Sequence, residues 1–569
     1  MPHENQYSAW MGSVYVFNLI VGTGALTLPG AFASAGWLLS SAGIIILALF
    51  SYITAGWIVE AMACANAINH WRRVKQLKKR GHVPDELVNR TLENAAEGSR
   101  NAALLAGTGS DEPANVHSAA AKSSSAGGDT SDASDAASSL AAAAANETDD
   151  SDDINVETTE ASEMITTSSD SPSSEDHEEE ETPLIHGVVI ERTVGQYYAI
   201  QERVEMGEMA KLFYSKWWVQ VFCVVLCIYL YGDLAIYEAA VAKSVRDMVC
   251  TYVPTNCSQA LHDSDPCFPD SDYSRFNVYR ICVCCFVGVM GPFVFLNLTK
   301  TKYMQIVTSI IRWIAMIVMI VWAVAVIVKG NTHVSPAVAR WQNLPDLFGV
   351  CVYSFMCHHS LPSLVTPIAV KTHLYKLLAA DYILILLFYL LLAFTGIFAF
   401  PNIEDLYTIN FQPDPCKHGQ PVSFVYIVRV FLLMFPVFTL STNFPIIAIT
   451  LRNNLKGLML RETRRYGFFT TRLSFPLLAT IPPTVVALIT CNVELLVGIT
   501  GAFAGSIIQY VIPATMVHSA RVETLQKIGL GVRNPFVSPF QSAFWRYLIC
   551  VWALLCWVFV AVYLIRTES

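Results

Sequence analysis

Charged residues are scarce in this sequence, in which Asp, Glu, Lys and Arg together make up only 15% of 569 residues. A soluble domain carries about 25% of these residues. Hydrophobic residues account for 53% of the chain, and the mean hydropathy is +0.43. This composition excludes a soluble single-domain enzyme and predicts an all-α polytopic membrane protein that is embedded in lipid.

The sequence also lacks the short motifs of common catalytic sites. It contains no Gly-x-Ser-x-Gly nucleophile elbow, no glycine loop ending in Gly-Lys-Ser or Gly-Lys-Thr, and no His-Glu-x-x-His string, the marks of hydrolases, phosphate-binding enzymes and zinc enzymes. Cys357, His358 and His359 are adjacent but have no further metal-ligating residue nearby in the sequence. We therefore expect no enzyme activity, no cofactor, no metal centre and no nucleic-acid partner.

Basic residues are absent from one acidic stretch, residues 147–181, which holds 15 of the 46 acidic residues. The formal net charge is −9, yet the rest of the chain, with 37 basic and 31 acidic residues, has a net charge of +6. Residues 82–190 contain no Phe, Trp or Tyr and cannot bury enough apolar surface to offset chain entropy. We therefore divide the chain into transmembrane helices 1 and 2 (residues 1–66), a disordered acidic cytosolic loop (67–203), and an amphipathic segment with the remaining helices (204–569).

Apolar runs long enough to cross the bilayer, which needs about 20 residues, occur eleven times. They predict transmembrane helices at residues 8–32, 37–63, 217–239, 278–298, 306–328, 347–368, 377–400, 424–451, 474–491, 495–517 and 544–564. Lys and Arg near the ends of these spans number 20 on one side and 8 on the other. By the positive-inside rule the N-terminus is cytosolic and the C-terminus is luminal or extracellular.

Most of the fifteen cysteines do not suggest a disulfide scaffold, because eleven lie inside apolar runs, where Cys behaves as a small hydrophobic residue. The other four fall on the predicted luminal side, where disulfides persist; they are Cys250, Cys257, Cys267 and Cys416. Two bridges among them allow three connectivities, and free thiols are the alternative. A sequon on the same side predicts a glycan at Asn256.

Two short strings in the cytosolic loop resemble sorting signals. Glu180, four positions before Leu184 and Ile185, completes an acidic dileucine pattern, whose aliphatic side chains would fill an apolar pocket of a clathrin adaptor. A chance match is the alternative, and the string Tyr197-Tyr198-Ala199-Ile200 resembles a tyrosine signal at lower specificity. These strings favour an endolysosomal membrane over the plasma membrane. The following residues, 204–214, predict either an interfacial helix or an extension of the third span.

Two of the predicted spans contain residues that break helices at mid-membrane depth. The first span contains Gly22-Thr23-Gly24-Ala25 followed by Pro29, and the sixth contains Phe355-Met356-Cys357-His358-His359 followed by Pro362. Transporters built from inverted repeats bind substrate where corresponding helices are interrupted, and five spans separate these two strings. Close packing of small residues is the alternative for the glycine string, and a role in the core is the alternative for the histidines.

The broken helices predict a site for a zwitterion. Backbone N–H groups near Gly24 and Ala25, at the start of a half-helix, suit a substrate carboxylate. Carbonyl groups freed at Phe355, Met356 and Cys357 suit an ammonium group.

Four strings together resemble the amino acid/auxin permease family. They are Gly22 to Pro29, Phe355 to Pro362, Phe435-Pro436 in the eighth span, and Val497-Gly498-Ile499-Thr500-Gly501 through Pro513 in the tenth. The resemblance covers all eleven spans. It implies a five-plus-five inverted-repeat transporter core with an extra C-terminal helix, and secondary transport of amino acids.

Ionisable residues inside a span are costly and point to function. Asp233, in the third span, has no Lys or Arg within four residues on either side. Desolvation would favour its protonated form, which suits proton coupling; a fixed acceptor paired with a tyrosine hydroxyl is the alternative. His358 is the next candidate for the coupling group. We expect Arg312, near a span end, to snorkel toward the membrane surface.

Ser441 and Thr442, in the eighth span, offer two hydroxyl groups for Na⁺. In sodium-coupled members of the wider superfamily, hydroxyls of this span and carbonyls from the break in the first span hold the ion. The alternative is that the hydroxyls bond to carbonyls of their own helix. The expected partners are therefore membrane lipid, a small amino acid, and H⁺ or Na⁺.

The leading hypothesis is a cation-coupled amino acid transporter that works by alternating access. The alternative is a non-transporting amino acid sensor or partner-binding membrane protein of the same fold.

Overall fold

The computed structural model describes residues 6–79, 197–252, 262–269, 271–295, 302–330, 336–412, 424–460, 467, 469–529 and 532–568. Within these residues every regular element is a helix, and β structure is limited to two isolated bridges, Tyr7 with Ile368 and Pro266 with Ser274. The predicted all-helical class is confirmed for this part of the chain.

The elements, in chain order, are α1 (Ala9–Ile20), α2 (Thr23–Ala35), α3 (Trp37–Lys79), α6 (Met206–Phe213), α7 (Lys216–Val249), α8 (Arg275–Met290), η1 (Gly291–Phe295), α9 (Lys302–Val328), η2 (Trp341–Asn343), α10 (Leu344–Ser354), α11 (Leu361–Val365), α12 (Leu374–Ala399), η3 (Tyr407–Phe411), α13 (Phe424–Met459), η5 (Phe469–Ser474), α14 (Phe475–Ile489), α15 (Val493–Thr500), η6 (Gly501–Gly505), η7 (Ile507–Val511), α16 (Ile512–Lys527) and α17 (Ala543–Glu568). The turns η5, η6 and η7 are π-helical.

The number of spans differs from the eleven expected. Among the described residues, nine helices are long and apolar enough to cross a membrane, and a tenth span results if the bent pair α1 and α2 is counted as one. The difference lies in predicted span 347–368, which the structure divides into α10, of 11 residues, and α11, of five. Neither is long enough to cross about 30 Å of hydrocarbon, because the polar string between them does not continue the helix.

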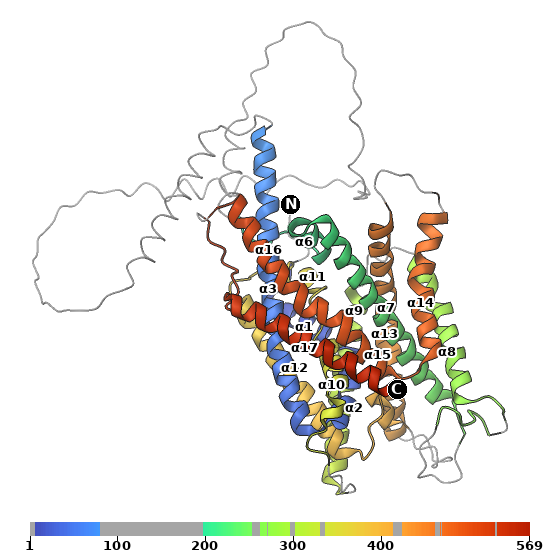
Figure 1. Ribbon diagram of the computed structural model, residues 1–569. Helices are drawn as coiled ribbons and strands as arrows, with labels where there is room; N and C mark the ends of the chain where they lie inside the picture. Colours follow the sequence, from blue (N-terminus) through green and yellow to red (C-terminus); the bar gives the residue numbers. More distant parts are fainter. Residues whose placement is uncertain are drawn as a thin grey trace, which may run out of the picture. The chain divides into compact units, whose positions relative to one another are not determined.

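Long helices surround the broken ones (Figure 1). The 43-residue α3 packs against α16 and α12, and the 34-residue α7 packs against α13, α8 and α14. The short α10 lies against α2 on one side and against α15 and η6 on another. Its backbone touches that of α15, because a Cβ added to Gly349 would lie 2.0 Å from the Gly498 oxygen, and it touches that of η6, because a Cβ added to Gly501 would lie 2.0 Å from the Gly349 oxygen. These close contacts fix the position of α10 between the continuous helices.

The segment before α7 packs on the protein itself. Helix α6 buries Met206, Met209 and Phe213 against neighbouring helices that include α7, α16 and α3. Its apolar face is therefore covered by protein, and α7 starts separately at Lys216. The preceding Ile200 is only 2% exposed, so a receptor could not reach it. The tyrosine sorting signal that the sequence suggested is not available in this structure.

A disulfide joins Cys250, at the end of α7, to Cys267. The backbone N–H groups of Thr251 and Tyr252 both donate to the Cys267 carbonyl, at 2.9 and 3.0 Å, and these bonds hold the loop against the helix end. The remaining predicted positions in the loops lie outside the described residues; they are Asn256, Cys257 and Cys416, and the sorting residues Glu180, Leu184 and Ile185.

Candidate functional site

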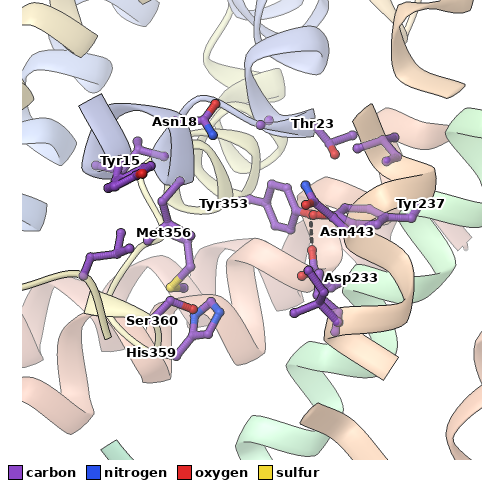
Figure 2. Close-up of a pocket in the computed structure, with 18 of the residues that line it drawn as sticks. Tyr15, Asn18, Thr23, Asp233, Tyr237, Tyr353, Met356, His359, Ser360 and Asn443 are labelled. Atoms are coloured by element: carbon purple, nitrogen blue, oxygen red, sulfur yellow. Dashed lines mark hydrogen bonds between the residues drawn. The ribbon is translucent and has the colours of Figure 1, made fainter. Parts of the chain in front are cut away.

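A cavity of about 490 Å³ lies where the two broken helices meet (Figure 2). Its walls come from α1, α2, α7, α9, α10, α11 and α13 and from the non-helical segment between α10 and α11. In the view of Figure 2, Met356, His359 and Ser360 lie on one side, whereas Asp233 and Tyr237 lie on the other. The cavity is thus enclosed by elements far apart in the sequence.

The first break separates α1 from α2, whose axes differ in direction by 55°. Helix α1 ends at Ile20, and Gly22 is the N-cap of α2. Gly22, Thr23 and Gly24 line the cavity, whereas Ala25, also predicted to bind substrate, is fully buried away from it. The N-terminal end of α2 therefore opens on the cavity, where backbone N–H groups favour an anion.

The two glycines of this break have different surroundings. A Cβ added to Gly24 would lie 2.6 Å from the Ser354 Cα atom, whereas a Cβ added to Gly22 would have no atom within 4 Å. Gly24 is therefore required for the close packing of α2 on α10, as the alternative interpretation held. A bulky residue at Gly24 would disturb folding, so Gly22 is the better position at which to probe the cavity.

One side chain at this break has a buried hydroxyl group with no hydrogen-bond partner among the described residues. The Thr23 Oγ1 atom is buried and makes no hydrogen bond in the described part of the chain. A buried polar group normally finds a partner. Because Thr23 lines the cavity, a bound molecule can supply one.

The second break separates α10, which ends at Ser354, from α11, which begins at Leu361. Of the three residues predicted to bind substrate here, only Met356 lines the cavity. Phe355 is fully buried with its ring 5.3 Å from that of Tyr389, and the Cys357 sulfur lies 3.3 Å from the Tyr382 hydroxyl. Phe355 and Cys357 thus hold the break in place from behind the cavity wall.

Asp233 lines the cavity from α7 and is 5% exposed. The Tyr353 hydroxyl, on α10, donates a hydrogen bond to its Oδ1 atom (Figure 2). The predicted pairing with a tyrosine is therefore present, and the carboxyl group also faces the cavity. Tyr229 and Tyr237 line the cavity from the same helix. A carboxyl group among such side chains is stripped of most of its water, which disfavours its charged form.

Arg312 also lines the cavity, and the expectation that it snorkels is wrong. The residue is 5% exposed, and its Nη1 atom donates to the backbone oxygen of Asn18 and, at 2.9 Å, to the Asn18 Oδ1 atom. Helix α9 turns this side chain inward because Ala315, Met316 and Met319, on the same face, pack into the core. The cavity therefore holds one buried cation as well as one carboxyl group.

His358, the second candidate for a coupling group, lies outside the cavity. Its Nε2 atom is 2.8 Å from the Thr54 Oγ1 atom, and the side chain is fully buried. The structure thus places His358 in the core, and the neighbouring His359 lines the cavity with its ring 5.4 Å from that of Tyr229. Among the described residues, no three His, Cys, Asp or Glu side chains are arranged to hold a metal ion.

The predicted sodium ligands are not brought together. Neither Ser441 nor Thr442 lines the cavity, and the Thr442 hydroxyl donates to the Thr439 carbonyl of its own helix at 2.9 Å. The carbonyl of Asn18, near the end of α1, already accepts a hydrogen bond from Arg312. A guanidinium group therefore stands at the carbonyl end of α1, where the sequence suggested that a sodium ion binds.

Comparison with known proteins decides the family. A family model described as transmembrane amino acid transporter protein matches residues 5–76 and 191–559. The chain belongs to the transmembrane amino acid transporter family. Both helix breaks and every described residue of the cavity wall lie within the matched ranges of this family.

Three relatives that align with nearly the full chain are named transmembrane protein 104 or a homolog of it. Transmembrane protein 104 of Gallus gallus is 40% identical over 576 residues, which cover 99% of this chain and 97% of the relative. The Homo sapiens protein is 40% identical over 570 residues with the same coverage. The Drosophila melanogaster transmembrane protein 104 homolog is 38% identical over 568 residues, with 98% and 97% covered. Their names state no substrate or coupling ion.

Sequence reasoning missed several residues of the cavity wall. Tyr7, Tyr15 and Tyr237 line the cavity, but tyrosines are common near membrane surfaces and gave no distinct signal. Arg312 could have been found from its spacing to Ala315, Met316 and Met319. Residues three, four and seven positions apart lie on one face of a helix, so an apolar face of α9 that packs inward would include Arg312.

Proposed function

We propose that the protein is a secondary active transporter of amino acids or similar small zwitterions, working by alternating access and coupled to protons. The observation that carries the proposal is the meeting of two broken helices around one cavity that contains a buried cation, Arg312, and a buried carboxyl group, Asp233. Membership of the amino acid transporter family supports the same class of substrate.

The substrate carboxylate is proposed to bind at the N-terminal end of α2. A helix N-terminus presents N–H groups and a partial positive charge to an anion, and Gly22 leaves open space beside it. Thr23 offers a hydroxyl group that has no other described partner, and Arg312 adds a full positive charge to the cavity wall. All of these groups suit the carboxylate that amino acids share.

The substrate ammonium group is proposed to bind between Asp233 and the second break. Helix α10 ends at Ser354, so its last carbonyls and the negative end of its dipole face the break. Asp233 reaches the same region through its hydrogen bond with Tyr353, one residue before the end of α10. A cation placed there meets a carboxyl group and a helix C-terminus together.

Protons are favoured over sodium as the coupling ion, because groups expected to bind sodium are already occupied and because Asp233 can bind a proton. Arg312 already supplies positive charge at the carbonyl of Asn18, and Thr442 is bonded within its own helix. Asp233, by contrast, can take up a proton, because burial makes its charged form costly. Protonation and deprotonation of Asp233 would then accompany each transport cycle.

The proposed architecture is a five-plus-five inverted repeat in which α1 with α2, and α10 with α11, open the two halves and α17 is an extra C-terminal span. We infer a cytosolic N-terminus and a luminal C-terminus, as the distribution of basic residues favours, and an endolysosomal compartment, as the dileucine string favours. The Cys250–Cys267 disulfide supports a luminal position for its loop. The dileucine string would then bind a clathrin adaptor.

The full-length protein in liposomes provides the test. Vesicles receive a mixture of the twenty standard amino acids, each isotopically labelled, with and without an inward pH gradient or a sodium gradient. We expect uptake that increases with the pH gradient and is unchanged by sodium. Gly22→Val should abolish uptake by filling the cavity, whereas Gly288→Val, on α8, should leave it intact.

Gly22 and Gly288 form a matched pair, since a Cβ added at either position would have no atom within 4 Å. Uptake by Gly22→Val at the wild-type rate would overturn the assignment of the cavity. Wild-type protein that is thermally stabilised by one of the amino acids but moves none of them would instead establish the alternative, a non-transporting sensor.

A further inference from the structure

One buried hydroxyl group lies within hydrogen-bond distance of both broken helices. Tyr389, on α12, has its oxygen 3.1 Å from the carbonyl oxygen of Ile20 and 2.9 Å from that of Ser354. Ile20 is the last residue of α1, and Ser354 is the last residue of α10. Tyr389 is fully buried behind the cavity wall.

The number of protons limits what this hydroxyl can do. The last four carbonyl groups of a helix have no partner within the helix. The Ile20 carbonyl accepts from the backbone N–H of Gly22 at 2.9 Å and has a second lone pair for Tyr389, whereas the Ser354 carbonyl accepts from the Tyr389 hydroxyl. A tyrosine hydroxyl carries a single hydrogen atom. It can therefore form a full hydrogen bond with one of the two carbonyls at a time, and the other carbonyl loses this donor.

The ring of Tyr389 is held in place, whereas the helices that it joins are interrupted. Helix α12 runs for 26 residues and packs against α9, α3 and α2. The Phe355 ring lies 5.3 Å from the Tyr389 ring, at an angle of 60°. Because α1 and α10 each end beside the cavity, their ends can shift more easily than this continuous helix.

We propose that Tyr389 is the positioning residue that joins the two helix breaks. Its hydroxyl donates to Ser354 in one conformation of the transporter and to Ile20 in the other. The movement of the two breaks is thereby coupled through one proton donor. This inference rests on the proposed transport function for its role in the cycle, but the link between the breaks can be measured without transport.

The chain contains a matched control for this residue. Tyr279, on α8, is also buried, and its hydroxyl is 2.7 Å from the Ala487 carbonyl oxygen and 3.1 Å from that of Thr490. Both of those carbonyls belong to the same end of α14, and Tyr279 does not line the cavity. Removal of either hydroxyl therefore costs the protein a similar bond, but of the two only the Tyr389 hydroxyl contacts the ends of two different helices.

The experiment compares Y389F with Y279F in the full-length protein. Uptake of the labelled amino acid mixture into liposomes should fall at least tenfold in Y389F and less than twofold in Y279F. Hydrogen–deuterium exchange should become faster in Y389F at residues 16–24 and 350–361 together, with no such change in Y279F. Equal uptake by the two variants when the wild-type protein transports, or faster exchange at only one break, would overturn the inference.

The outcomes separate this inference from the proposed function. Suppose that the wild-type protein transports none of the amino acids but hydrogen–deuterium exchange in Y389F is faster at both breaks. The proposed transport function is then wrong, and the proposed link through Tyr389 holds. Should Y389F fail to fold, 3,5-difluorotyrosine at position 389 keeps the ring and makes the hydroxyl a stronger donor. Exchange should then become slower at both breaks, and unchanged exchange would contradict the proposal.

Discussion

Helix α7 carries charged side chains in two different settings. In the cavity, Asp233 bonds to the neutral hydroxyl of Tyr353. Ten residues further along, about 15 Å at 1.5 Å per residue, Lys243 forms a 2.5 Å ion pair with Asp405, and Arg246 pairs with acidic neighbours. The same helix thus holds Lys243 and Arg246 in ion pairs at one end, and leaves Asp233 beside a neutral partner at the cavity.

The cation of the cavity follows the same pattern as its carboxyl group. Arg312 bonds to the neutral Asn18, and neither Arg312 nor Asp233 forms an ion pair with any described residue. A charge in an ion pair is neutralised within the protein, whereas a charge held by neutral partners remains able to attract a charged ligand or to change protonation. The difference indicates which region maintains the structure and which region binds.

The largest expected effect is on the stability of the ion-pair region at the end of α7. The Asp247 side chain is 2% exposed and pairs with both Arg246 and Arg275. Asp247→Asn leaves two buried cations without their shared partner and should lower the free energy of unfolding by about 3–5 kcal/mol. Denaturant unfolding measures this change. Uptake per folded molecule should stay at the wild-type level, and a selective loss of uptake would show that this region also takes part in binding.

The next effect separates binding from stability at the cavity. Arg312→Gln keeps a donor for Asn18 but removes the charge, so uptake should fall about 100-fold, equivalent to about 2.7 kcal/mol. The matched control is Arg452→Gln, since Arg452 is also buried and its Nη1 atom donates to the Val294 carbonyl at 2.8 Å, outside the cavity. Equal uptake by the two variants in liposomes would remove Arg312 from the binding site.

A smaller effect distinguishes the two glycines of the first break. Gly24→Ala forces a methyl group to within 2.6 Å of the Ser354 Cα atom, and such overpacking should cost about 1–3 kcal/mol of stability. Gly22→Ala should change stability by less than about 0.5 kcal/mol, since its methyl group meets open space. Thermal unfolding of the two variants tests this order. A reversed order would mean that α2 and α10 do not pack as described.

The smallest effect concerns acid stability outside the membrane. Burial alone would raise the pKa of Asp263, but the Cys491 thiol, 3.0 Å away, and the nearby Arg246 and Lys243 hold that pKa below its ordinary value. A carboxyl group with a lowered pKa stabilises the fold above its unfolded pKa of 3.8, and the contribution is lost as the pH falls through the lower folded value.

Asp263→Asn should therefore lower stability equally at pH 7 and pH 5. The change should be below about 1 kcal/mol, because half of the Asp263 side chain is exposed and solvent screens its pair with Arg246. Thermal unfolding at pH 7, 5 and 3.5 provides the measurement. A difference between variant and wild type that vanishes already at pH 5 would place the Asp263 pKa above its ordinary value.

The sequence revealed the features of the site that are local along the chain. Gly22 and Gly24 stand out within an apolar run, the polar string after Ser354 interrupts another, and Asp233 is conspicuous because it has no charged neighbour. The structure contains both breaks and places Asp233 at the cavity. Each of these features depends on residues close together in the sequence, and so could be predicted from it.

Other features depend on contacts between distant residues. Arg312 and Asn18 are 294 positions apart, and Tyr389 and Ile20 are 369 positions apart, so no sequence pattern connects them. The sequence also could not show which of His358 and His359 faces the cavity, for a different reason. These residues lie between α10 and α11, where no helical period shows which side chain faces the cavity.

The most direct test of proton-coupled transport is Asp233→Asn in liposomes, with pH-driven uptake and substrate exchange measured on the same preparation. The amide keeps the shape of the side chain and an acceptor for Tyr353 but cannot release a proton. We expect acceleration of uptake by an inward pH gradient to disappear while exchange of labelled for unlabelled substrate continues, because exchange needs no net proton movement. Full pH-driven uptake by the variant would contradict proton coupling through Asp233.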